Sequence, residues 1–510
     1  MSSVTHVTDS IQTGESRRSG IVSDSLVSGL VFALTLTVAQ RMLGAVRGVL
    51  FCRLMTDQQL GQWSMIYSFL MMLAPLAVLG LPGSFGKYVE QYSHTGQLKP
   101  FLRQVNRVCC VTTLLLASIV CIAPGFFSQQ ILGESRHVGL MYFMAATLVL
   151  LTLLNYLTSL VESLRQIRLV TVMRFLSGAS FTVLGILLLV SPMDSSIAAI
   201  ASFALSCIIG AIPALWYLKK KRPEFSAMNQ PLNNAAMWMQ LAPFAAWWWV
   251  SNILHNASEL VDRYMLVHIG SMSAFEVQGS LGQYHSSRVV PLIMVGVAAM
   301  LSGLLLPYVA ASWQAGDFRR ARQQLNMTIK LSSLGMMIAN VVMLASAPLL
   351  FDWVLQGKYS EGLSILPLTM VYCTWFSIQV VSQDYLWVSE KGKFAVLCMA
   401  IGLFGNVVFN WFLIPYWGLW GAVTATTLGN LLGVSTMYWA NYRMGCPPDR
   451  GCWIGLAFPL VLLADPLMAI LLTLIVSVGC LLTRAYFSAD EQTMLREMVG
   501  KRLGRLGKSD

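Results

Sequence analysis

The chain has 510 residues, of which 56% are hydrophobic and only 11% are charged, and its mean hydropathy of +0.64 is too high for a soluble domain of this size. These values exclude a soluble globular protein and indicate an integral membrane protein. The net charge is +11, but the basic residues are spread among loops rather than gathered on one soluble face, which argues against nucleic acid as a partner.

The first 25 residues are polar and rich in Ser and Thr. They contain neither a short basic start nor a small-residue cleavage site ahead of the first apolar run, so they do not resemble a signal peptide. We therefore expect residues 1–25 to form a disordered cytoplasmic tail.

A series of apolar runs follows, and most approach the roughly 20 residues that a helix needs to cross the hydrocarbon core. Backbone groups in lipid must be hydrogen-bonded within the segment, so the runs are predicted to be helices, and the nearly continuous apolar stretch from Met141 to Leu154 argues against a β-barrel. The thirteenth run is short, and thirteen spans is the alternative if it does not cross. The fourteen predicted spans are 26–50, 61–84, 106–127, 138–161, 169–191, 196–218, 239–266, 286–311, 329–351, 363–387, 394–415, 418–441, 452–464 and 466–484.

The loops differ in charge on the two sides of the predicted membrane. Even-numbered gaps hold most of the Lys and Arg, whereas the odd-numbered gaps hold little more than Arg53, Arg136 and Lys358. Because basic residues collect on the cytoplasmic side, both termini are predicted to be cytoplasmic, which requires an even number of spans.

A short element recurs in the two halves of the chain. Leu60-Gly61-Gln62-Trp63 opens the second span and Leu281-Gly282-Gln283-Tyr284 precedes the eighth, each after a helix with an arginine toward its outer end. This similarity of position predicts an internal duplication into parallel repeats. We expect an all-α polytopic protein with two six-helix lobes, 26–218 and 239–441, around a central cavity. Two further helices would lie in 452–484, and 485–510 would form a basic amphipathic helix on the anionic inner leaflet.

Arg41 and Arg47 lie inside the first apolar run, where an arginine at mid-bilayer depth costs about 2.5–3.5 kcal/mol and usually faces a water-filled cavity or an anion. On an ideal helix they are about 9 Å apart along the axis and roughly 120° apart around it. We predict that both reach a cavity, with an interfacial position as the alternative for Arg47. Arg288 is ambiguous in the same way, and Arg174 is expected to reach the cytoplasmic interface.

Two acidic residues of the seventh span, Glu259 and Asp262, are candidates for coupling to a proton or cation. Asp262 is better placed, although its neighbour Arg263 is expected to neutralise it. Trp247 to Trp249 lie deep in the same span, where packing is the default expectation and a cavity wall is the alternative. The ten cysteines lie mostly in apolar runs and predict no metal site, and we expect no cofactor.

With these features in place, the chain resembles the oligosaccharide flippase (polysaccharide transport) family of the multidrug/oligosaccharidyl-lipid/polysaccharide exporter superfamily. The residues that carry the resemblance are Gln40 to Arg47, Leu60 to Trp63, Asp262 to Leu266, and Leu413 to Val423. It implies a non-enzymatic flippase of a bacterial inner membrane, which moves an undecaprenyl-pyrophosphate-linked oligosaccharide across the bilayer by alternating access.

The first span also looks like that of lipid II flippases, which implies that Arg41, Arg47 and Arg288 line the cavity and bind the pyrophosphate. Those flippases carry a further arginine around the second span, where this chain has only Lys87. The implied partners are the lipid-linked oligosaccharide, membrane lipids, and a polysaccharide polymerase or glycosyltransferases.

Two other functions stay open at this point. A multidrug exporter of the same superfamily is expected to have an acidic cavity for cationic drugs, whereas the intramembrane charge here is largely basic. A membrane glycan polymerase usually needs a large outward loop, and no outward gap offers one. An ATP-driven pump is disfavoured because the chain has no Gly-x-x-x-x-Gly-Lys-Ser/Thr phosphate loop.

Overall fold

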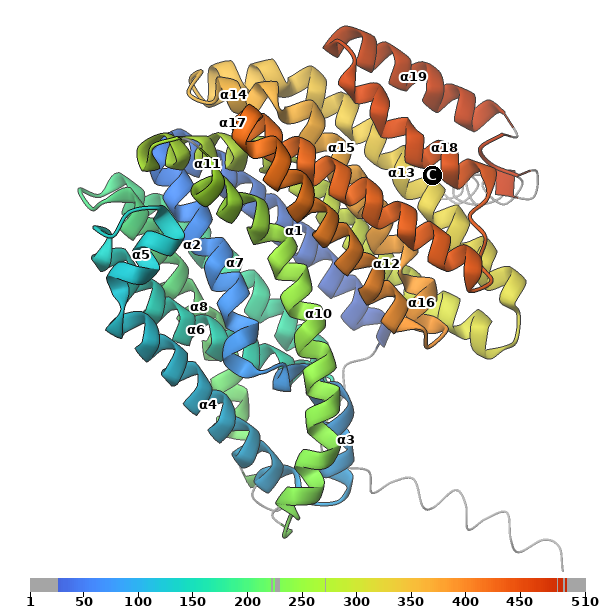
Figure 1. Cartoon of the computed structure of the whole chain (residues 1–510). Helices are drawn as coiled ribbons and strands as arrows, with labels where there is room; N and C mark the ends of the chain where they lie inside the picture. Colours follow the sequence, from blue (N-terminus) through green and yellow to red (C-terminus); the bar gives the residue numbers. More distant parts are fainter. Residues whose placement is uncertain are drawn as a thin grey trace, which may run out of the picture.

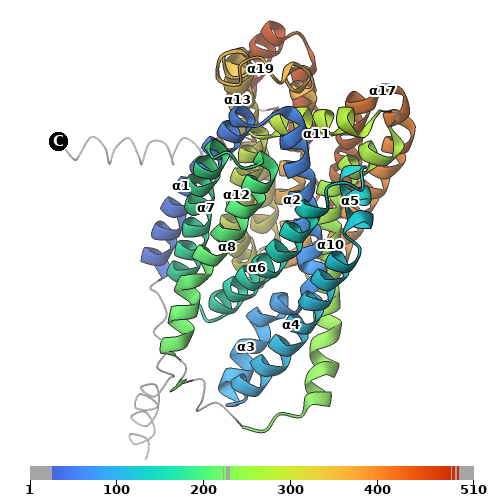
Figure 2. The same cartoon turned by 90° about the vertical axis from the view of Figure 1, so that its left-hand side faces the viewer.

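The computed structural model describes residues 26–221, 223–224, 230–270, 272–483, 485–488 and 491–492, with the backbone alone for 26–34 and 304. The predicted tail 1–25 and most of the predicted tail 485–510 lie outside the described residues. Within these ranges the chain is helical and forms no strand. Figures 1 and 2 show a bundle of long helices, most of which run in the same general direction.

The N-terminal half forms one group of helices. Thr56 begins α2 with a capping box, in which its side chain accepts from the Gln59 backbone N–H and the Gln59 side chain accepts in return. Asp194 caps α8 in a related way. The helices of this half are α1 (Leu26–Leu54), α2 (Asp57–Val78), the 3-10 turn η1 (Leu81–Ser84), α3 (Phe85–His94), α4 (Leu98–Ile122), α5 (Pro124–Leu132), α6 (Val138–Ser163), α7 (Ile167–Val190) and α8 (Ser195–Lys220).

The C-terminal half repeats several of these features. Ser273 begins α11 with a second capping box, completed by Glu276. The helices are α10 (Asn234–Ile269), α11 (Ala274–Arg288), α12 (Pro291–Gln314), α13 (Phe318–Pro348), the π-helical η2 (Leu349–Val354), α14 (Ser360–Ser364), α15 (Leu366–Ser382), α16 (Asp384–Val388), α17 (Gly392–Arg443), α18 (Arg450–Ala457), the 3-10 turn η3 (Phe458–Leu463) and α19 (Pro466–Leu482).

Eight described helices are long and apolar enough to cross a membrane, and two shorter apolar helices follow at 450–463 and 466–482. One of the eight, α17, contains the predicted spans 394–415 and 418–441, which meet at Gly418 in a left-handed conformation with φ of 50°. The predicted eighth span, 286–311, is wrong at its start. Pro291 lacks a backbone N–H and begins a new helix, so Arg288 is instead the last residue of α11. The count of fourteen stays a prediction.

The two halves meet where the repeated Leu-Gly-Gln elements cross. A methyl group on Gly61 would overlap the Gln278 backbone carbonyl, and one on Gly282 would overlap that of Asp57. Gln278 precedes Gly282 by four residues, as Asp57 precedes Gly61, so the contact is reciprocal, as at a two-fold interface. Figure 1 shows α11 lying across the upper end of α2, the end at which the predicted outward loops lie.

At the opposite end, the beginning of α10 packs against the first half of the chain. Met237, Leu241 and Ala245 belong to a buried apolar cluster formed otherwise by residues of η1, α2, α3, α4 and α6 to α8. The Tyr88 hydroxyl of α3 donates to the Gln240 carbonyl at 2.9 Å. Both views show the lower half of α10 beside α3 (Figures 1 and 2). Helix α10 therefore joins the two halves over its length.

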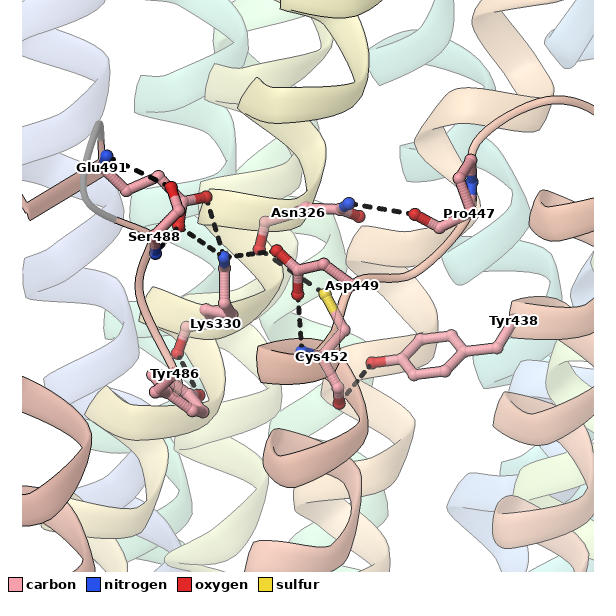
Figure 3. A network of polar contacts seen from close by, with 9 residues as sticks. All are labelled: Asn326, Lys330, Tyr438, Pro447, Asp449, Cys452, Tyr486, Ser488 and Glu491. Carbon is pink, nitrogen blue, oxygen red and sulfur yellow. Dashed lines mark hydrogen bonds and ion pairs between the residues drawn. The ribbon is translucent and has the colours of Figure 1, made fainter. Parts of the chain in front are cut away.

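A buried ion cluster attaches the C-terminal helices to α13. Lys330, which is fully buried, donates to Asp449 before α18 at 2.6 Å and to Glu491 after α19 at 2.6 and 2.8 Å. The Tyr486 hydroxyl donates to the Lys330 carbonyl at 2.8 Å, as Figure 3 shows. Tyr486 and Phe487 are themselves buried, so the first described residues of the predicted tail pack on the helical bundle.

Candidate functional site

A cavity of about 500 Å³ lies among the helices of the N-terminal half, and Trp248 and Asn252 of α10 complete its wall. Its walls carry charged, amide and hydroxyl groups although the surrounding helices α6 and α7 have mean hydropathies of 1.9. Polar groups in an apolar environment are unfavourable unless they contact water or a ligand. The polar lining residues are Gln40, Arg47, Tyr67, Thr152, Asn155, Thr158, Ser159, Glu162, Arg174, Ser177, Trp248 and Asn252. We call this the N-lobe cavity.

Arg47 lies on the wall of the N-lobe cavity. Its guanidinium carbon is 4.1 Å from the centre of the Phe181 ring on α7, a cation–π contact. No ion pair of Arg47 with a carboxylate forms among the described residues. The ring holds the guanidinium in position without neutralising its charge, so Arg47 can bind an anion.

Arg41 lies in a different environment, six residues earlier on α1. Its side chain is exposed, and its guanidinium lies against Gly296 of α12, where an added methyl would be 2.9 Å from the guanidinium carbon. Arg41 thus lies between a helix of the first half and a helix of the second. This separation from Arg47 follows the angular offset expected on one helix.

The N-lobe cavity contains a second arginine, Arg174 of α7. Its Nη2 donates to the Glu162 carboxylate at the end of α6 at 3.1 Å. Both side chains remain more than half exposed, at 53% and 59%. We expected Arg174 to reach the cytoplasmic interface, and the sequence did not indicate that it would also line a cavity. Its place on the cavity wall depends on how α6 and α7 are rotated against each other.

A second, smaller cavity of about 60 Å³ lies in the C-terminal half. We call it the C-lobe cavity. Arg288 and Glu259 line it and form a charged hydrogen bond, and the Arg288 guanidinium also lies 5.3 Å from the centre of the Tyr284 ring. Arg288 is buried, and its Nε and Nη1 atoms have no hydrogen-bond partner. The structure therefore does not bring Arg41, Arg47 and Arg288 into one cavity.

Asp262 also lines the C-lobe cavity and belongs to a chain of hydrogen bonds. Its Oδ2 accepts from the Tyr284 hydroxyl at 2.5 Å and from the Thr426 hydroxyl at 3.2 Å. Asn406 donates to the Thr426 hydroxyl and accepts from Asn410. Asp262 Oδ1 and Asn410 Oδ1 are buried without a donor. Two unsatisfied oxygens in one buried network of oxygen ligands are suited to a proton or a small cation.

Arg263 and Asp262 interact electrostatically without an ion pair, so the expected neutralisation stays a prediction. Adjacent residues on a helix point about 100° apart, and the two side chains form no ion pair in the described structure. Arg263 instead donates to the Ser68 hydroxyl and to the Ser64 carbonyl of α2. It therefore bridges the two halves, while Asp262 faces the C-lobe cavity.

Sequence reasoning missed the contact between Asp262 and Thr426 because the two residues are 164 positions apart in the chain. Asn406 and Asn410 are four apart on a largely apolar helix, and Thr426 follows after the break at Gly418. Buried amides at this spacing share one helix face and were the available signal. For Trp248, packing was the default expectation and a cavity wall was the alternative. It does both, because it packs on Gly83 and lines the N-lobe cavity.

Comparison with known proteins assigns the chain to a family. A family described as polysaccharide biosynthesis protein matches residues 26–313, more than half of the chain. The chain belongs to this family. As a member of the polysaccharide biosynthesis family it is also similar to the lipid II flippase MurJ of Bacillus subtilis (strain 168), with 23% identity over 443 residues that cover 79% of this chain and 77% of MurJ.

Solved structures show the same fold. A lipid II flippase MurJ in an inward closed conformation matches with a TM-score of 0.68 and 14% identity, covering 88% of this chain and 97% of that one. An inward-facing multidrug resistance MATE family transporter of the MOP superfamily matches with a TM-score of 0.61 and 12% identity, covering 81% and 98%. These matches confirm the predicted all-α, polytopic fold.

Proposed function

We propose that this protein is a flippase that moves an undecaprenyl-pyrophosphate-linked oligosaccharide from the inner to the outer leaflet of a bacterial inner membrane by alternating access, with both termini in the cytoplasm. The observation that carries the proposal is Arg47, which faces a polar cavity of about 500 Å³ with no carboxylate partner among the described residues. The similarity to MurJ proteins and membership of the polysaccharide biosynthesis family support it.

The chemistry of the N-lobe cavity fits a lipid-linked glycan. Guanidinium groups bind phosphate oxygens in charge-assisted pairs. The amide and hydroxyl groups of Asn155, Thr158 and Ser159 are suited to sugar hydroxyls, and Trp248 adds an aromatic surface. The polyprenyl tail can remain in the bilayer, so only the head group and sugars need the cavity.

The three predicted pyrophosphate ligands then act at different steps. Arg47 is the ligand in the conformation described here. Arg41 lies beside α12, at a seam between the two halves, and would contact the head group as it passes. Arg288 is bound to Glu259, and would contact the pyrophosphate after a rearrangement exposes its two free N–H groups.

Coupling to an ion gradient belongs to the same proposal. Asp262 is the better candidate because one of its oxygens has no donor, whereas Glu259 is occupied by Arg288. A proton or monovalent cation at Asp262 would alter the hydrogen bonds that Asp262 accepts from Tyr284 and Thr426. Binding there would change the packing of α10 against α17 and so favour one state of the cycle.

The test is binding of undecaprenyl pyrophosphate by the purified full-length protein, measured by native mass spectrometry. Wild-type protein should bind this lipid in preference to undecaprenol, and Arg47→Ala should lose that preference. Equal binding of both lipids by wild type would overturn the proposal. Selective binding of lipophilic cations instead would favour a multidrug exporter, the function of the MATE relatives.

A further inference from the structure

We propose that Arg174 receives the pyrophosphate at the cytoplasmic mouth of the N-lobe cavity and passes it to Arg47, and that Glu162 occupies Arg174 until the substrate arrives. This inference rests on the proposed function and assigns an uptake step to a pair of residues. Arg174 would be a substrate-binding residue during uptake.

The spacing along α7 places the two arginines on one path. Phe181, which contacts Arg47, follows Arg174 by seven residues. Seven residues make about two helical turns, so the two side chains share one face of α7 and lie about 10 Å apart along its axis. Arg174 is on the side of the predicted cytoplasmic end, and both arginines line the same cavity. A pyrophosphate that enters from the cytoplasm therefore meets Arg174 before Arg47.

The facing helix carries a matching polar stripe. Asn155, Thr158, Ser159 and Glu162 recur at intervals of three and four on α6, and all four line the cavity. Residues at this spacing share one helix face. The stripe extends about 10 Å along α6, which equals the distance along α7 from Arg174 to Phe181. Polar side chains of α6 are therefore available to the pyrophosphate between Arg174 and Arg47.

The Glu162 and Arg174 pair can be exchanged for a substrate contact. Both side chains are more than half exposed, and exposed ion pairs of this kind are weak. Glu162 lies in the last turn of α6, where the helix dipole disfavours a negative charge. Helix stability therefore does not account for Glu162, whereas temporary neutralisation of a substrate-binding arginine does. A pyrophosphate offers more oxygens and more charge than one carboxylate, so it can displace Glu162.

The experiment uses geranyl pyrophosphate, a soluble short-chain prenyl pyrophosphate, and the full-length protein in nanodiscs, with association rates measured by surface plasmon resonance. Arg174→Gln should reduce the association rate about tenfold, since local charge steers anions to a site. Glu162→Gln should raise it, because Arg174 is then free. Arg165→Gln and Glu90→Gln are matched controls, because Arg165 and Glu90 form an exposed pair at 2.8 Å whose residues do not line the cavity, and both should leave the rate unchanged.

The directions in which Arg174→Gln and Glu162→Gln change the association rate distinguish a substrate contact from a purely structural ion pair. If the pair only joined α6 to α7, both substitutions would break it and would change binding in the same direction. A change in the same direction, or no change in either variant while Arg47→Ala still weakens binding, would overturn the role of Arg174 and leave the proposed function intact. Failure of the wild-type protein to bind the pyrophosphate would instead count against the proposed function itself.

Discussion

The two cavities handle charge in opposite ways. In the N-lobe cavity Arg47 lies on an aromatic ring with no carboxylate partner among the described residues, and the ion pair between Glu162 and Arg174 is more than half exposed. In the C-lobe cavity Arg288 is buried and paired with Glu259, and Asp262 accepts two hydrogen bonds. The space differs as well, at about 500 Å³ against about 60 Å³.

This contrast shows how the two halves of one chain can have different roles. A charge that is already paired and buried is expensive to separate, so it serves structure or responds to a small ion. A charge that faces a roomy polar cavity is available to a large anion. We therefore propose that the N-lobe cavity binds the substrate and that the C-lobe cavity couples transport to an ion.

The largest expected effect concerns the ion cluster of the second half. Lys330→Met leaves Asp449 and Glu491 without their common partner and should reduce the free energy of unfolding by about 3–5 kcal/mol. Thermal unfolding in detergent measures this loss. Arg174→Gln breaks the exposed pair of the first half and should cost less than about 1 kcal/mol. Similar losses of unfolding free energy in Lys330→Met and Arg174→Gln would contradict the difference between a buried, paired charge and an exposed one.

The next effect is on substrate affinity. Arg47→Ala should weaken binding of undecaprenyl pyrophosphate by about 10- to 100-fold, since a hydrogen bond to a charged group contributes about 1.5–3 kcal/mol. Lipid titrations followed by native mass spectrometry measure the affinity. Arg53→Ala serves as the control because Arg53 is exposed near the end of the same helix and does not line the cavity. An equal loss in the control would show that general charge, and not the N-lobe cavity, attracts the lipid.

A third effect tests whether the contact between the halves opens during the cycle. Gly61→Ala places a methyl group against the Gln278 carbonyl and should disfavour the closed contact of α2 and α11 by about 1–3 kcal/mol. Pulsed electron paramagnetic resonance between labels at Ser135 and Ser360, in a protein without the exposed Cys110 and Cys121, should show longer distances. Gly335→Ala is the control, because a methyl there meets no atom within 4 Å. Unchanged distances in Gly61→Ala would contradict an opening of this contact.

The smallest change in stability should come from Asp262→Asn. The amide oxygen can still accept from Tyr284 and Thr426, so the unfolding temperature should change little. The variant should nevertheless lose any dependence of transport on a proton or sodium gradient, measured in proteoliposomes, while keeping its affinity for the lipid. Asp384→Asn, a buried carboxylate that is not in the lining of the C-lobe cavity, is the control. Retained ion dependence in Asp262→Asn would move coupling elsewhere.

Much of the fold was predictable because a membrane helix is specified locally. Each apolar run must satisfy its own backbone in lipid, so the helical class and most helix positions follow from the run itself. The start of the eighth span was missed because Val289 and Val290 continue the apolar pattern up to Pro291, although the proline ends the preceding helix. Hydropathy alone does not distinguish one long helix from two that meet at a break.

The candidate site was predictable only in part. The intramembrane arginines stand out because their burial in lipid is unfavourable wherever the helix lies. Their neighbours do not stand out, since Glu162 and Arg174 belong to different helices and Asp262 meets Thr426 across 164 residues of sequence. A hydrophobic pattern does not give the rotation of one helix against another.

By itself, the sequence determined the membrane class and the helices, and it indicated that Arg47 and Asp262 would need polar surroundings, because each depends on the unfavourable transfer of polar groups into hydrocarbon. The tertiary structure decided which charges are paired and which are free. It placed Arg41 against α12, directed the hydrogen bonds of Arg263 to α2, and brought Arg174 to the cavity of Arg47. Those outcomes depend on helix rotation and crossing, which packing between distant segments determines.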